Sequence, residues 1–181
     1  MTNSFKILQW NCRGIGANLT DLQLLLSQNV HVACLQETRL HPNSQFSIKH
    51  YSTYNYNPNT PNDSSPTPGG ISILVHSSIP HTSLHLNTSL QAQAIKISLD
   101  QTITICNIYI PPHSAPTEQD LTNLIHQLPV PFLFIGDFNA HHPVWGNLKQ
   151  CPKGTLIENI IINNDISLLN NCKVLDRALG R

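Results

Sequence analysis

The sequence contains few charged residues and no excess of either sign. Lys and Arg number 10, Asp and Glu also number 10, and charged residues make up 11% of the 181 residues. High-affinity nonspecific binding of nucleic acid depends on many cationic contacts to phosphate, so this composition argues against that class of protein. This composition is still compatible with a cleft that carries a few local positive charges.

Long apolar runs and paired cysteine motifs are also absent. No apolar stretch approaches the length that crosses a membrane, and the first residues, MTNSFKILQWNC, lack the apolar core of a secretory signal. The 5 cysteines are widely spaced and never form CxxC. We therefore expect reduced cysteines, an intracellular location without a recognisable targeting signal, and no membrane contact.

What is present is enough apolar sequence for one folded domain over residues 1–181. Hydrophobic residues make up 40% of the chain. Their patterns predict strands at residues 5–10, 30–37, 71–75, 94–99, 102–109, 132–135 and 166–171, with a hairpin turn at Asp100 and Gln101. Residues 55–68, rich in Pro and Asn, predict a long exposed loop.

Helical spacing predicts three helices. Leucines at 19, 22, 25 and 26 form one apolar stripe, with Asn18 or Thr20 as a cap. Thr117 followed by Asp120 predicts the start of a second helix, and an apolar stripe indicates a third at Leu156, Ile157, Ile160 and Ile161. Helices and strands alternate with hairpins, which is typical of a mixed α/β (α+β) fold.

Several predicted strands end in polar residues: Asn11, Glu37, Tyr109, and Asp137 with Asn139. Ligands gather outside strand ends in α/β sheets, so these side chains are expected to converge. The alternative is that each residue has only a structural role. Asp and Asn bond their own backbone in turns, and a tyrosine near a strand end is often a half-buried aromatic.

Together these residue types suit metal-assisted hydrolysis of a phosphate ester. Glu37, helped by the Asn11 amide, would hold Mg²⁺, which prefers oxygen ligands and keeps several waters. Asp137 would orient or deprotonate the attacking water, and Asn139 would hold that water or a phosphate oxygen. The Tyr109 hydroxyl would donate to the phosphoryl group as charge develops.

The motifs WNCRGI, LQET, GGISILV, IYIPP and GDFNAHHPVWG, in this order, resemble the endonuclease/exonuclease/phosphatase superfamily. They are most similar to the N-terminal endonuclease domain of jockey-like non-LTR retrotransposons, over residues 5–171. The resemblance implies a four-layer sandwich of two packed mixed sheets flanked by helices, with the site at one end. It also implies Mg²⁺, or alternatively Mn²⁺, as cofactor, DNA as partner and the nucleus as location.

Carried over residue by residue, the resemblance assigns the same roles to the strand-end residues. Asn11 and Glu37 match the metal-site asparagine and glutamate, and Tyr109 matches the phosphate-contacting tyrosine. Asp137 and Asn139 match the water-activating pair.

Two basic side chains extend this assignment to DNA contact. Arg13 stands where repair-type abasic endonucleases carry an acid, which favours the retrotransposon branch and a contact to a DNA phosphate. His142, in HHPVW, is a further candidate for DNA contact. The alternative is that Trp145 stabilises this loop while the histidines are solvated.

The C-terminal sequence CKVLDRALGR departs from the family, because it lacks the S-D-H motif whose aspartate and histidine complete the site. The chain contains 10 histidines, and those in its second half do not stand in that context: His113, His126, His141 and His142. We therefore expect a domain incomplete at its C-terminus, without its last strands, that binds Mg²⁺ weakly and has impaired or no activity.

The leading functional hypothesis is a Mg²⁺-dependent DNA endonuclease that nicks a phosphodiester. In an intact element the nick supplies a 3′ end for reverse transcription. The alternatives are a phosphomonoesterase of the same superfamily and a non-catalytic remnant of the domain. We expect a monomer, although the sequence does not define the oligomeric state.

Overall fold

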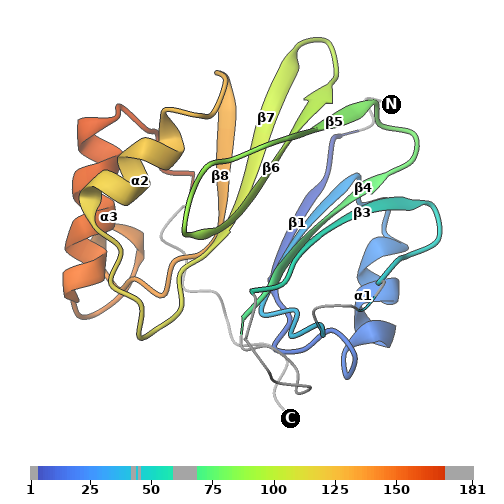
Figure 1. The fold of residues 1–181 in the computed structure, drawn as a ribbon, viewed down its shortest axis with the longest axis horizontal. Helices are drawn as coiled ribbons and strands as arrows, with labels where there is room; N and C mark the ends of the chain where they lie inside the picture. The colour runs from blue at the N-terminus through green and yellow to red at the C-terminus, as the bar shows by residue number, and fades with distance from the viewer. Residues whose placement is uncertain (1–3, 42–43, 45, 59–68, 170–181) are drawn as a thin grey trace.

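Two four-stranded sheets pack face to face, and helices cover their outer faces (Figure 1). The computed structural model describes residues 4–41, 44, 46–58 and 69–169. One helix lies on the outer face of the first sheet and two lie on that of the second. The predicted four-layer sandwich of mixed sheets is therefore confirmed.

The first sheet has the strand order β1-β2-β4-β3. Its strands are β1 (Ile7–Asn11), β2 (Val32–Gln36), β4 (Ile71–His76) and β3 (Tyr51–Tyr56). β1 and β2 run parallel, whereas β4 is antiparallel to both β2 and β3. The parallel pair places the carboxyl ends of β1 and β2 at the same edge of the sheet.

The second sheet has the order β5-β6-β7-β8. Its strands are β5 (His81–Leu84), β6 (Gln91–Ser98), β7 (Thr102–Tyr109) and β8 (Phe132–Asp137). β5, β6 and β7 are antiparallel, and β8 runs parallel to β7. This sheet therefore also has one parallel pair, in which Tyr109 is level with Asp137.

The helices are α1 (Leu19–Leu26), α2 (Glu118–Ile125) and α3 (Pro152–Asn163), with a short 3₁₀ helix, η1 (Pro143–Trp145), before α3. α2 begins with the predicted capping box, in which Thr117 and Asp120 bond each other's backbone N–H. Asn18 precedes α1 but does not cap it. Its side-chain amide donates instead to the carbonyls of Cys12 and Gly14 and so orders the loop after β1.

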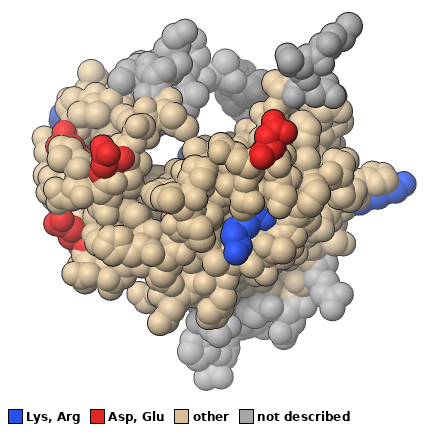
Figure 2. Space-filling view, turned by 90° about the horizontal axis from the view of Figure 1, so that it is seen from above, with Lys and Arg blue, Asp and Glu red and all other residues tan. Residues whose placement is uncertain are grey.

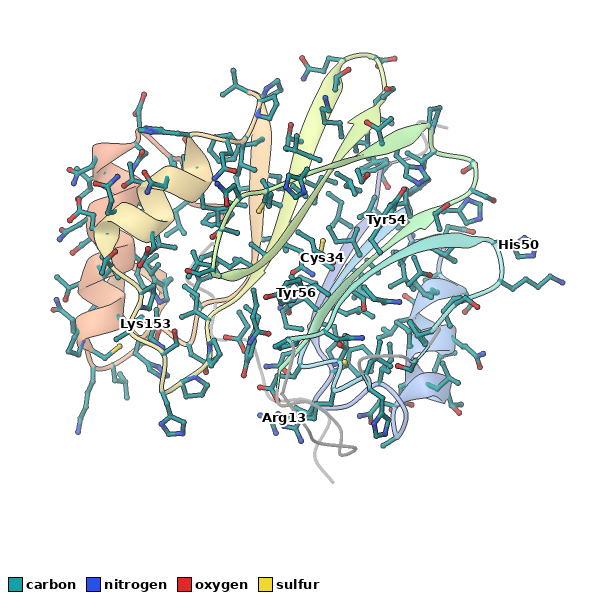
Figure 3. The ribbon with its side chains drawn as sticks, in the orientation of Figure 1. Arg13, Cys34, His50, Tyr54, Tyr56 and Lys153 are labelled. Carbon is teal, nitrogen blue, oxygen red and sulfur yellow. The ribbon has the colours of Figure 1, made fainter. Side chains whose placement is uncertain are left out.

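Apolar side chains fill all three spaces between the four layers. Along β2, Val32 and Cys34 face the opposite sheet, while Ala33 and Leu35 face α1. Successive side chains of a strand point to opposite faces, so a strand covered on both sides is apolar throughout. All five residues of β2 are buried accordingly. Cys34 lies between the two sheets in Figure 3.

A buried polar contact joins the two sheets within this core. The Gln36 amide donates to Asn107 Oδ1 at 2.7 Å, and Asn107 Nδ2 donates to the carbonyls of Leu35 at 3.0 Å and Ser72 at 3.1 Å. Gln36, Ser72 and Asn107 are all fully buried. Buried polar groups are stable when they are paired in this way, and the pairing fixes how the sheets sit on each other.

The structure corrects the predicted elements in three places. Residues 51–56 form β3, although the sequence predicted a loop from residue 55, and β5 was not predicted. The strand predicted at residues 166–171 is not formed at 166–169, where the chain is irregular. Residues 59–68, which make up most of the predicted loop, and the C-terminal residues 170–181 lie outside the described residues.

Within the described part of the chain, no helix has both the length and the hydropathy needed to cross a membrane.

Candidate active site

The polar strand ends of both sheets lie at the same end of the sandwich. β1 and β2 bring Asn11 next to Gln36, so that Glu37 follows directly, and β7 and β8 bring Tyr109 next to Asp137. Hydrogen bonds link these four side chains, Asn11, Glu37, Tyr109 and Asp137, into one cluster. The predicted convergence is therefore observed for these four side chains, whereas the Asn139 amide bonds the Ile110 carbonyl instead. The catalytic roles of all five residues stay predictions.

Asn11 lies between the two carboxylates. Its Nδ2 donates to Glu37 Oε1 at 2.9 Å and to Asp137 Oδ2 at 2.6 Å. A carboxylate accepts hydrogen bonds at both oxygens, and one amide nitrogen can serve two acceptors because it carries two hydrogens. Asn11 turns its nitrogen, and not its oxygen, toward the carboxylates. In this geometry it positions both acids, and a role as metal ligand would need the oxygen instead.

Glu37 accepts hydrogen bonds from three side chains. Oε1 accepts from Asn11 and from the Tyr109 hydroxyl, the latter at 3.2 Å, and Oε2 accepts from Arg39 Nη2 at 2.7 Å. Partial burial opposes ionisation of this carboxyl, but the three donors together outweigh it and lower the pKa of Glu37. Glu37 is thus a preorganised carboxylate at neutral pH.

Arg39 is a member of the site that the sequence analysis did not identify. The signal was present in LQETR, where a cation follows the glutamate by two residues. Residues two apart point to the same face of a regular strand, so this spacing is compatible with contact. The pair lies just beyond the end of β2, where Glu37 and Arg39 both have left-handed φ, at 52° and 50°.

Asp137 and Asn139 form a turn at the end of β8. The backbone N–H of Asn139 donates to Asp137 Oδ1 at 2.9 Å, and the Asn139 amide donates to the Ile110 carbonyl at 3.1 Å. Turn formation was the alternative to a functional role, and the structure shows the turn, while the functional role stays a prediction. The turn holds one oxygen of Asp137 while the other faces Asn11.

Tyr109 is almost entirely enclosed, with 5% of its surface exposed. Burial, followed by the nearby charge of Glu37, raises the pKa of the Tyr109 hydroxyl to about 12. The hydroxyl therefore keeps its proton at neutral pH and acts as a donor.

A hollow of about 400 Å³ opens beside Asn11 and Asp137. Trp10, Cys12, Arg13 and Asn18 complete its lining. Arg13 is exposed and also has a left-handed φ, of 49°. It lies at the lower end of the molecule in Figure 3, where β1 ends, and so places a positive charge on the hollow that Asp137 also lines.

His142, the second predicted DNA contact, is buried in the protein and not solvated. Its exposed fraction is 6%, its Nε2 lies 3.3 Å from Glu158 Oε2, and its Nδ1 accepts from the backbone of Val144. Trp145 packs on it and donates its indole N–H to the Ala140 carbonyl. The loop-stabilising role of Trp145 is what the structure shows, and a DNA contact by His142 stays a prediction without support from its position.

Lys153, in the first turn of α3, braces the loop that follows β7. Its Nζ donates to the carbonyls of Pro111 at 2.8 Å and Pro112 at 3.2 Å. Burial lowers the pKa of this lysine, while the charges of Cys151 and Asp137 oppose the shift. Figure 3 shows it on the helical side of the molecule. Lys153 thereby ties α3 to the loop that follows Tyr109.

Solved structures share this architecture. The endonuclease domain of TRAS1, a telomere-specific non-LTR retrotransposon, matches with a TM-score of 0.64 and 16% identity, over 88% of this chain and 70% of that one. The 3′ phosphatase NExo from Neisseria, bound to product DNA hairpin, matches with a TM-score of 0.62 and 15% identity, over 88% and 71%. This chain has the endonuclease/exonuclease/phosphatase fold.

The sequence of this chain is similar to regions of mobile-element proteins. A family model described as endonuclease-reverse transcriptase matches residues 103–177. The RNA-directed DNA polymerases from mobile element jockey are 25% identical in Drosophila melanogaster and 28% identical in Drosophila funebris, each over 92% of this chain. The endonuclease/exonuclease/phosphatase-fold chain is thus homologous to a region of jockey-like retrotransposon proteins. It spans about 18% of the length of these curated relatives.

Proposed function

We propose that this chain is a metal-dependent DNA endonuclease domain that nicks a phosphodiester. The observation that carries the proposal is the pair of carboxylates, Glu37 and Asp137, which come from different sheets and share the Asn11 amide. A buried tyrosine hydroxyl donates to Glu37, and an exposed arginine lines the same hollow as Asp137. Homology to jockey-like retrotransposon proteins supports DNA as the substrate.

The donor set fits Mg²⁺. Mg²⁺ binds through one or two carboxylates, keeps several waters and takes further oxygens from substrate phosphate. Glu37 offers such a carboxylate, already ionised, and the remaining ligands would be waters and substrate oxygens, because the described residues contain no group of three or more His, Cys, Asp or Glu that could hold a metal ion. When bound, the cation would neutralise charge on a phosphate oxygen, and Mn²⁺ would serve equally on this donor set.

Asp137 would prepare the attacking water. The Asn139 backbone and the Asn11 amide each hold one of its oxygens, so the carboxylate is fixed in orientation. In the proposed step, water attacks phosphorus, Asp137 accepts the water proton, and the bond from phosphorus to the 3′ oxygen breaks. The leaving oxygen takes a proton from solvent water and becomes the 3′ hydroxyl from which a reverse transcriptase can extend, and the other product carries the phosphate at its 5′ end.

Tyr109 and Arg13 act on the phosphate group. The Tyr109 hydroxyl keeps its proton and is a donor to the phosphoryl oxygens as their charge increases. Arg13, on the rim of the hollow, binds a neighbouring phosphate. Figure 2 views the molecule from the end opposite to this site. On that surface the charged side chains lie apart from one another, and most of the surface is uncharged.

The test is nicking of supercoiled plasmid by residues 1–181 in Mg²⁺. Asp137→Asn should lower the nicking rate by at least about 10²-fold, since it removes the proton acceptor. Asp100→Asn is the matched control, because Asp100 is an exposed carboxylate in the turn before β7, at the opposite end of the strand from Tyr109. Equal nicking by Asp137→Asn and the wild type would contradict the proposal.

A parallel assay with p-nitrophenyl phosphate separates nicking from the phosphomonoesterase alternative. Release of phosphate from this ester without plasmid nicking would favour a phosphomonoesterase. The absolute nicking rate of the wild type also tests the expectation of impaired activity, which stays a prediction.

A further inference from the structure

Arg39 covers the one oxygen of Glu37 that the other site residues leave open. Asn11 and Tyr109 donate to Oε1, whereas Oε2 accepts from Arg39 Nη2 at 2.7 Å. The Glu37 side chain is 15% exposed and that of Arg39 is 49% exposed. The carboxylate is therefore neutralised from its solvent side by a cation that belongs to the chain itself.

The backbone holds both residues of this pair in place. Glu37 and Arg39 adopt left-handed φ values of 52° and 50°, which cost about 1 kcal/mol or more for residues with a side chain. The strand-entry glycines before β4 hold this turn, since Thr38 N–H donates to Gly70 at 3.1 Å and Arg39 N–H donates to Gly69 at 2.9 Å.

The guanidinium itself is held much less firmly. Its only side-chain hydrogen bond within the described part of the chain is the one to Glu37. A half-exposed ion pair of this kind is worth about 0–1 kcal/mol, so it can be exchanged for another cation at small cost. The backbone of Arg39 is therefore held in place, whereas its guanidinium can be displaced from Glu37 by another cation.

We propose that Arg39 is an internal counter-cation, which occupies Glu37 Oε2 until a divalent cation binds there and then contacts a DNA phosphate. The inference rests on the proposed function only in taking Glu37 as the cation ligand. A guanidinium and a divalent cation on the same oxygen repel each other, so binding of one favours release of the other. The released guanidinium has five donors in a planar fork, which suits a phosphate group.

Cation affinity tests the first half of the proposal. Mn²⁺ binding to the metal-free protein, measured by electron paramagnetic resonance, should be about three- to tenfold tighter in Arg39→Gln than in the wild type, because the competitor is gone. Arg39→Lys keeps the positive charge and should stay close to the wild type. Unchanged or weaker binding in Arg39→Gln, or no Mn²⁺ binding by any of the proteins, would overturn the proposal.

Arg13→Gln is the matched control for charge. Arg13 is also an exposed arginine at this end of the molecule, but the hydrogen bonds of Glu37 do not include it. It should change Mn²⁺ affinity by less than twofold. An effect as large as that of Arg39→Gln would show that net charge, and not occupation of Oε2, controls cation binding.

DNA affinity tests the second half. The dependence of duplex DNA binding on salt, followed by fluorescence anisotropy, should steepen by about 0.9 in log–log slope when Ca²⁺ replaces EDTA, because one phosphate contact is gained. Arg39→Gln should lack this change, and an equal change in that variant would overturn the released-arginine step. Neither measurement depends on turnover. If both give the expected results and the protein does not nick plasmid, only the proposed function is contradicted.

Discussion

The side-chain amide of Asn11 donates a 2.6 Å hydrogen bond to Asp137, which lies 126 residues further along the chain and in the other sheet. The same nitrogen donates to Glu37. Asn11 is thus the side chain through which the two sheets set the distance between the two acids.

Replacing Asn11 should therefore damage the site more than the fold. Asn11→Leu keeps a similar volume but leaves two neighbouring carboxylates without their shared donor, so their orientation is lost. We expect the plasmid-nicking rate to fall by about 10²-fold, as for other small misplacements of reacting groups. Urea unfolding should show a much smaller relative change. A nicking rate within threefold of the wild type would show that Asn11 does not position the acids.

The lowered pKa of Glu37 predicts how stability depends on pH. A carboxyl whose pKa is lower in the folded protein stabilises the fold above its usual pKa of about 4.3, and this contribution is lost as pH falls through the lower folded value. Glu37→Gln should therefore be less stable than the wild type at pH 7, by about 1 kcal/mol. The difference should shrink between about pH 5 and pH 3.

Urea unfolding at several pH values measures this difference. Asp100→Asn, in the exposed turn between β6 and β7, is the control for removal of a carboxylate as such. A Glu37→Gln difference that stays constant from pH 7 to pH 3 would contradict the assigned pKa shift.

The central strands and the site cluster were predictable because apolar patterning is strongest where a strand is covered on both faces. β2 is buried at all five positions, and its sequence is apolar up to the polar end. The edge strands β3 and β5 have the sequences YSTYNY and HTSL, with few aliphatic residues. An edge strand is partly solvated, so its sequence carries a weaker signal and both were missed.

Arg39 and His142 show where residue spacing alone was not sufficient to predict a contact. The contact of Arg39 with Glu37 depends on a left-handed turn whose support comes from the glycines before β4. The burial of His142 depends on Glu158, which α3 brings back from 16 residues later to lie 3.3 Å from its ring. Both outcomes arise from tertiary packing, which local spacing does not encode.

Asn107 should be the polar residue whose loss most affects stability. Asn107→Ala removes the acceptor of Gln36 and leaves the buried carbonyls of Leu35 and Ser72 without this donor. Unpaired buried polar groups cost about 1–3 kcal/mol each, and neighbouring effects are not additive, so we expect a loss of about 2–4 kcal/mol. Urea unfolding measures it. Asn123→Ala, on the exposed face of α2, should change stability by less than about 0.5 kcal/mol. A loss no larger than that of this control would show that the inter-sheet contact is replaceable.

Gly136, directly before Asp137, allows β8 to approach β7 closely. It pairs with Ile108 in the parallel ladder, and a Cβ at position 136 would overlap the Ile108 carbonyl. An alanine there can be accommodated only if β8 moves away, and Asp137 moves with it. We expect Gly136→Ala to cost about 1–3 kcal/mol, as overpacking typically does, and to lower nicking by about 10²-fold through displacement of the acid. Gly16→Ala is the matched control, because nothing lies within 4 Å of a Cβ at that position. If the two alanine variants unfold at the same urea concentration and nick plasmid at the same rate, then β8 tolerates the added methyl group and the position of Asp137 does not depend on this glycine.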